Sequence, residues 1–73
     1  MQKEILKKFG SKVRKLRLDK NLSQEELAHK ASLHRTYIGM IERGEKNITL
    51  LNIEKIANSL EINTYELFQN IGE

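Results

Sequence analysis

The chain has 73 residues, so we expect residues 1–73 to form one domain with a small hydrophobic core. It contains no cysteine, which excludes a disulfide framework and a thiolate metal site and favours the reducing cytoplasm as its compartment. No apolar run approaches the roughly 20 residues that span a bilayer, and no cleavable signal pattern opens the sequence, so we expect no membrane association.

Catalytic and metal-binding patterns are missing from the sequence. His29 and His34 are five positions apart and have no acidic or cysteine partner at the spacing of metal ligands. The sequence also lacks a glycine-rich phosphate loop and paired carboxylates in an apolar setting. We therefore expect no metal, no cofactor, no small-molecule substrate and no enzymatic activity.

The net charge of +3 conceals a gradient along the chain. Residues 1–20 carry eight lysines and arginines against two acids, a net charge of +6, whereas residues 47–73 carry one lysine against four acids, a net charge of −3. A basic end of this kind is typical of a surface that meets a polyanion. The alternative is that the lysines only keep a first helix in solution.

Residues 2–20 are expected to form the first helix. Its apolar positions fall within one stripe about 100° wide, as a core-facing helix requires: Ile5, Leu6, Phe9, Val13 and Leu16. Gly10 should weaken the helix by ~1 kcal/mol, so the helix is expected to bend or to begin after it. Asn21 is a suitable left-handed stop.

Residues 22–47 predict two short helices joined by a tight turn. Ser23 and Glu26 have the spacing of a capping box, in which each residue satisfies an amide of the other. The pattern breaks at residues 31–34, and a second helix is expected from Arg35 to Gly44, a glycine suited to the left-handed conformation that ends a helix. Two helices with so short a turn make a helix-turn-helix, whose second helix enters the DNA major groove.

The second of these helices has two different faces at 100° per residue. Tyr37, Ile38 and Ile41 are expected to face the core. The opposite face has a cation and a hydroxyl near its N-terminal end, where a recognition helix touches base edges; it comprises Arg35, Thr36, Gly39, Met40 and Arg43. An ordinary solvated face of a helical bundle remains the alternative.

Two more helices are expected after the loop. One is capped by Thr49 and should bury five residues on one face: Leu50, Ile53, Ile56, Ala57 and Leu60. The last should run from Asn63 to about Gly72, with Glu66 at the capping-box position and three residues turned inward: Leu67, Phe68 and Ile71. The predicted fold class is thus all-α, a bundle of five helices.

The segment SQEELAHKASLHRTYIGMIERG, residues 23–44, resembles the helix-turn-helix of the phage-repressor and Cro-like family, also called the Xre type. The flanking segments fit the same pattern, so the resemblance covers nearly the whole chain. The length of the chain and the HRTYI-x-x-IERGEKN segment resemble the controller proteins of restriction-modification systems. These resemblances imply a repressor-like five-helix homodimer that binds a palindromic operator and activates or represses transcription.

The resemblance also implies roles for individual residues. Arg35, Thr36 and Met40 would contact bases, and an arginine can form two hydrogen bonds with one guanine. Five residues would contact phosphates: Gln24, Tyr37, Arg43, Lys46 and Asn47. Because the family places an arginine and a glutamate at Arg17 and Glu42, these two are expected to form a partly buried ion pair.

The sequence departs from the family pattern at two positions. Ser32 stands where a glycine is usual in the turn, so a left-handed Ser32 should carry strain of about 1 kcal/mol. Gly39 stands where a polar residue is usual, which leaves a gap in the expected reading face. A base contact is therefore not expected at that position.

The dimer interface is predicted at Leu51, Tyr65 and Phe68, large apolar residues of which Leu51 and Tyr65 lie off the core stripes. Glu25 or Glu26 is a candidate contact for RNA polymerase. The competing function is an interaction protein, such as an antitoxin, that uses the acidic C-terminal half to mask a partner and binds DNA secondarily. The sequence leaves open the operator, the target genes and the balance of activation and repression.

Overall fold

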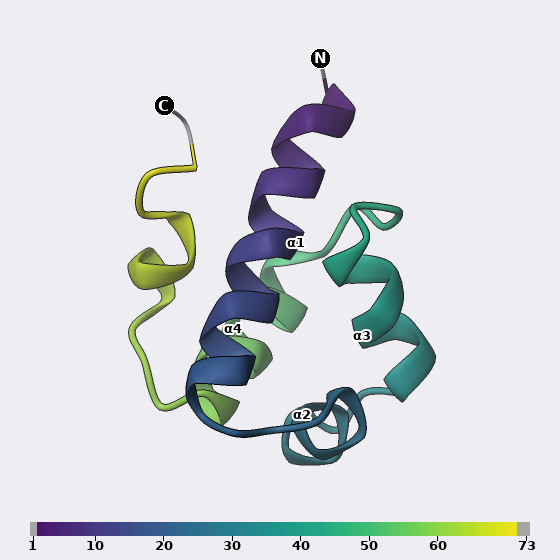
Figure 1. Ribbon diagram of the computed structural model, residues 1–73, viewed down its shortest axis with the longest axis vertical. Helices are drawn as coiled ribbons and strands as arrows, with labels where there is room; N and C mark the ends of the chain where they lie inside the picture. Colours follow the sequence, from purple (N-terminus) through teal and green to yellow (C-terminus); the bar gives the residue numbers. More distant parts are fainter. Residues whose placement is uncertain (1, 72–73) are drawn as a thin grey trace.

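A computed structural model describes residues 2–71, with side chains from residue 4 onward. Its elements are four α-helices and a 3-10 helix, in the order α1 (Gln2–Asp19), α2 (Gln24–Ala31), α3 (Arg35–Glu42), α4 (Leu50–Ser59) and η1 (Thr64–Phe68) (Figure 1). The described part of the chain contains no strand. None of its helices combines the length and the apolar character needed to cross a membrane. The all-α fold class is therefore confirmed.

The prediction of five α-helices is wrong, because the last element is a five-residue 3-10 helix. Its start is as predicted: the Asn63 N–H donates to the Glu66 carboxylate at 2.8 Å. The chain leaves the helical conformation at Gln69, which has extended backbone angles, and Asn70 has a positive φ of 68°. The helical segment is thus one short piece with the tighter 3-10 hydrogen-bond pattern. The predicted end at Gly72 lies outside the described residues.

One hydrophobic core joins all five elements. The central helix α1 packs against α3 on one side and η1 on the other, and α2 packs against both α3 and α4 (Figure 1). Seven side chains are completely buried at its centre: Val13, Leu27, Ile38, Ile41, Ile56, Leu60 and Leu67. Because α2 and α3 both contribute to this core, the helix-turn-helix cannot move independently of the rest of the fold.

Three predicted core residues are exposed instead of buried. Leu50 is the first residue of α4, where it projects beyond the core and is 79% exposed. Ile5 lies near the outer end of α1 and is 49% exposed. Phe68 is 41% exposed although its ring lies 5.5 Å from that of Phe9, because only one side of it packs. Helical periodicity predicts which face of a helix a residue lies on. It does not predict how far along the helix other elements pack against that face.

The predicted helix ends are confirmed in the backbone. Asn21 and Ser32 both have left-handed angles, with φ of 59° and 57°, and Gly44 has a φ of 74°. Ser32 therefore adopts the conformation that glycine usually supplies, at a cost of about 1 kcal/mol. These three residues reverse the chain after α1, α2 and α3 and so set the short connections of the helix-turn-helix.

At Gly10 the backbone of α1 lies directly against the end of α3. The helix α1 runs continuously through Gly10, contrary to a start after it. A Cβ atom built on Gly10 would overlap the carbonyl oxygen of Ile41 and lie 2.8 Å from that of Glu42. The missing side chain thus lets two helical backbones touch, which outweighs the low helix propensity of glycine.

We expect Gly10→Ala to lower the free energy of unfolding by about 1 to 3 kcal/mol, because the added methyl group must push α1 away from the backbone of α3. The matched control is Gly39→Ala. There the new Cβ would meet the Nη1 atom of Arg43 at 3.1 Å, and this exposed side chain can move aside. The control should therefore gain up to about 1 kcal/mol from helix propensity. Urea unfolding measures both; a Gly10→Ala protein as stable as the original would contradict the close contact.

Candidate nucleic-acid interface

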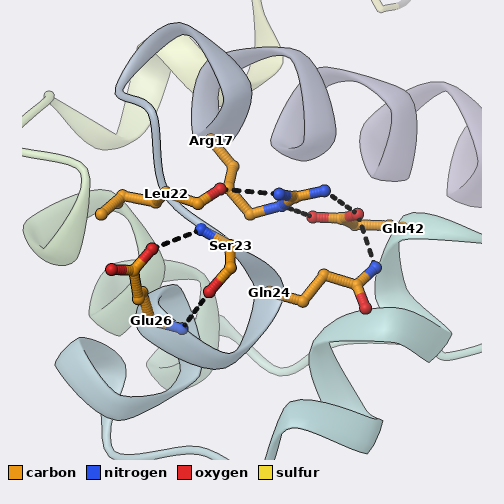
Figure 2. A network of polar contacts seen from close by, with 6 residues as sticks. All are labelled: Arg17, Leu22, Ser23, Gln24, Glu26 and Glu42. Atoms are coloured by element: carbon orange, nitrogen blue, oxygen red, sulfur yellow. Dashed lines mark hydrogen bonds and ion pairs between the residues drawn. The ribbon is translucent and has the colours of Figure 1, made fainter.

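The helix-turn-helix begins with a complete capping box at α2. The Ser23 Oγ accepts the Glu26 N–H at 3.0 Å, and the Glu26 carboxylate accepts the Ser23 N–H at 2.8 Å (Figure 2). The hydrogen bond from the Ser23 backbone, followed by that with its side chain, lowers the pKa of Glu26; the charge of Lys30 acts in the same direction. The first turn of α2 is thereby fixed, as the sequence predicted.

The recognition helix α3 begins with a cap that sequence reasoning missed. His34 is its N-cap, and the Nδ1 atom of the ring accepts the Thr36 N–H at 3.1 Å. Arg35 and Thr36 follow directly and are both exposed. The position of His34 immediately before the predicted helix start was the available signal, since an imidazole nitrogen can accept a hydrogen bond like the side chains more usual at this position.

A buried ion pair holds the other end of α3, as expected. Arg17 of α1 donates from Nε to Glu42 Oε2 at 2.7 Å and from Nη2 to Oε1 at 3.1 Å. Its Nη1 donates to the Leu22 carbonyl at 2.7 Å, and Gln24 Nε2 donates to Glu42 Oε1 at 3.0 Å (Figure 2). The residues Arg17 and Glu42 are 6% and 8% exposed. This network joins α1, the start of α2 and the end of α3.

Gly39 does not leave the open gap that the sequence suggested, because it is buried. A Cβ atom built on Gly39 would lie 3.1 Å from Arg43 Nη1 and 3.6 Å from Gln24 Oε1. These two side chains therefore cover the glycine. One hydrogen on the Gln24 amide nitrogen is used by Glu42, and the second is left to donate to a phosphate.

Tyr37 joins α3 to α4 through a contact that the sequence did not reveal. Its hydroxyl oxygen accepts a hydrogen bond from Asn52 Nδ2 at 3.0 Å, and both residues are half-buried. As an acceptor here, the hydroxyl keeps its own proton for donation. Only the tertiary fold brings Asn52 to this tyrosine, so no local pattern could have identified it.

The remaining candidate contacts lie on α3 and in the loop after it. Met40 is half-buried, whereas Arg43, Lys46 and Asn47 are exposed. Arg43 donates from Nε to Glu45 Oε2 at 3.0 Å, and this hydrogen bond, together with the carboxylate charge, raises the pKa of Arg43. The structure thus places every predicted base and phosphate contact on or beside the helix-turn-helix. Their contacts with DNA stay predictions.

The sequence pattern of the helix-turn-helix family matches residues 13–67. Several relatives carry the name control protein, and two of them show the extent of the similarity. The control protein C.BamHI of Bacillus amyloliquefaciens is 54% identical over 67 residues, covering 88% of this chain and 83% of the relative. The control protein C.MunI of a Mycoplasma species is 46% identical over 69 residues, covering 93% of each. The similarity therefore extends well beyond the helix-turn-helix segment.

A solved structure of a controller protein has the same fold. The restriction-modification controller protein C.AhdI of Aeromonas hydrophila superposes with a TM-score of 0.86 at 51% identity, covering 86% of this chain and 96% of that one. The agreement therefore extends to the arrangement of the helices over the matched part of the chain.

We expect Glu42→Gln to lower the free energy of unfolding by about 3 kcal/mol, because it leaves the buried Arg17 guanidinium without its counter-charge. Asp19→Asn is the matched control, since it removes the carboxylate of the exposed Lys15–Asp19 pair at 3.1 Å. That change should cost less than about 1 kcal/mol. Thermal and urea unfolding of both variants would show the difference; equal effects would mean that Glu42 does not serve as the counter-charge of a buried Arg17.

Proposed function

Because the chain belongs to the helix-turn-helix family and is so similar to the control proteins, we propose that it is a DNA-binding transcription regulator of a restriction-modification system. It acts as a homodimer on a palindromic operator, in the cytoplasm and without catalytic activity. The observation that carries this proposal is the first turn of α3. There Arg35 and Thr36 lie in solvent on a helix that is fixed at both ends.

Base recognition belongs to the exposed side of α3. Arg35 reaches furthest and can donate two hydrogen bonds to the edge of a guanine. Thr36 offers a hydroxyl and a methyl group, and the half-buried Met40 offers an apolar contact for a thymine methyl group. These side chains act from a two-turn helix that fits the major groove.

Phosphate binding surrounds this reading surface. Gln24 retains one amide hydrogen and Tyr37 retains its hydroxyl proton, as their internal hydrogen bonds show. Lys46 and Asn47 lie in the loop after α3. Arg43 lies where the helix meets this loop, and only its Nε is used, in the hydrogen bond to Glu45. Donors on both sides of α3 would set the position of the protein on the duplex without reading its sequence.

The dimer interface is proposed on α4 and η1, which contact each other. Leu51 is 71% exposed and Tyr65 is 61% exposed, as expected from their positions off the core stripes. Phe68 borders an apolar hollow of about 210 Å³ that also includes Ile5 and Ile48. So much exposed apolar surface on a small chain is suited to a second copy in a two-fold arrangement.

Activation would require a contact with RNA polymerase, for which the exposed first turn of α2 is the proposed surface. The Glu26 carboxylate is used in the capping box, whereas the neighbouring Glu25 is exposed and forms no hydrogen bond or ion pair with the described residues. Glu25 is therefore the better candidate for a polymerase contact. Repression would need only occupation of the operator.

Arg35→Ala should weaken binding to the specific site by about 1 to 3 kcal/mol per half-site and remove the preference at one base position. Lys46→Ala should weaken binding to specific and scrambled duplexes alike, and should reduce the salt slope by about one unit per lost phosphate contact. Titrations at several salt concentrations, with sites selected from a random DNA pool, distinguish the two. An equal loss on both duplexes for Arg35→Ala would make Arg35 a phosphate contact.

Leu51→Asp should give monomers at micromolar concentration while the helical circular dichroism is kept, because the exposed Leu51 is outside the core. Sedimentation of the wild type and the variant measures the change. Glu54→Asp is the control, because it changes an exposed residue of the same helix without removing apolar surface; this variant should sediment like the wild type. A dimer that survives both Leu51→Asp and Tyr65→Asp would place the interface elsewhere, and a wild-type monomer that captures another protein would favour the antitoxin-like alternative.

A further inference from the structure

The cap of the recognition helix is a titratable side chain. Serine, threonine and asparagine usually occupy this position, and none of them changes its protonation near neutral pH. Here His34 does so, through the hydrogen bond from the Thr36 N–H to Nδ1 at 3.1 Å. His34 is exposed, so protons and solvent have direct access to its ring.

This hydrogen bond exists in one protonation state only. An imidazole nitrogen that accepts a hydrogen bond carries no proton, so the neutral ring must hold its proton on Nε2. Protonation of Nδ1 turns both nitrogens into donors and removes the acceptor from the Thr36 N–H. It also puts a positive charge at the N-terminus of α3, where the helix dipole is already positive. The cap is therefore present at higher pH and lost as the pH falls.

The titratable groups nearest to His34 along the chain are basic: His29 and Lys30 in the last turn of α2 and Arg35 at the start of α3. The acids of the neighbouring helices are Glu25 and Glu26 in the first turn of α2, Glu42 at the far end of α3, and Glu54 beside Lys55 on α4. Among the described residues, the Thr36 amide is the one group that is bonded to the His34 side chain. The helix α1 meets the opposite end of α3, through Gly10 and Arg17.

We propose that His34 is a positioning residue for base recognition, whose neutral ring fixes Arg35 and Thr36 in their reading geometry and whose protonation lowers the specificity of the protein for its operator. This rests on the proposed function, in which those two residues contact bases. Loss of the cap loosens the turn that carries them. The new positive charge meanwhile attracts phosphates of any sequence, so the ratio of specific to non-specific affinity falls.

The test compares the wild type with His34→Asn and His34→Ala at about pH 8 and about pH 5.5, which bracket the titration of imidazoles. Each protein is titrated at constant salt against a duplex selected from a random pool by the wild type at the higher pH, and against a scrambled duplex. The affinity ratio of the wild type should fall about fivefold per half-site on acidification, the size expected for one helix cap. His34→Asn keeps a capping oxygen that does not titrate, so its ratio should stay constant. His34→Ala should have a low ratio at both pH values.

The outcomes separate the possible causes. A wild-type ratio that does not change with pH would overturn the inference, as would a His34→Ala ratio equal to that of the wild type at the higher pH. A pH dependence that persists in His34→Asn, which retains His29, would also overturn it by assigning the effect to another group. If the wild type prefers no duplex at the higher pH, the proposed function itself fails. Circular dichroism at both pH values shows that the three proteins remain folded.

Discussion

The bidentate contact between Arg17 and Glu42 is the constraint on which the geometry of the helix-turn-helix depends. Each carboxylate oxygen is assigned to a donor, and the guanidinium also binds the carbonyl of Leu22 at the entrance to α2. Three segments are therefore fixed relative to one another by one planar group. A lysine could not replace it, because an ammonium lacks the forked arrangement of donors that reaches all three acceptors.

A buried pair of this kind contributes more to the choice of arrangement than to net stability. Removing two charges from water costs several kcal/mol per ion, which the attraction between them only offsets when the hydrogen bonds are complete. Completeness is observed here, since the described residues contain no buried side-chain nitrogen or oxygen without a partner. Any rotation of α3 about its axis would leave Glu42 among apolar groups. The pair thus fixes which side of α3 faces outward, while the apolar core supplies most of the stability.

Local rules in the sequence predicted a large part of this structure. The capping box at Ser23 follows from residue spacing, and the left-handed Ser32 follows from the resemblance to the family; both were found where expected. Predictions failed where the answer depended on distant segments. Gly10 looked like a weak point in a helix until the backbone of α3 was seen against it, and the exposure of Leu50 depends on where its neighbours end. The contact between Tyr37 and Asn52 likewise requires the finished fold.

The shortness of α3 limits the information that the protein can obtain from a DNA sequence. The helix has eight residues, and its glycine is covered by two side chains, so few positions are left to distinguish bases. If three side chains each read one base pair, a two-fold site specifies six pairs and recurs by chance about once in 4,000 positions, against the ~10⁶ or more competing sites of a genome. Under the proposed function, the remaining discrimination would come from the mechanics of the duplex, through the sequence-dependent cost of bending and groove compression.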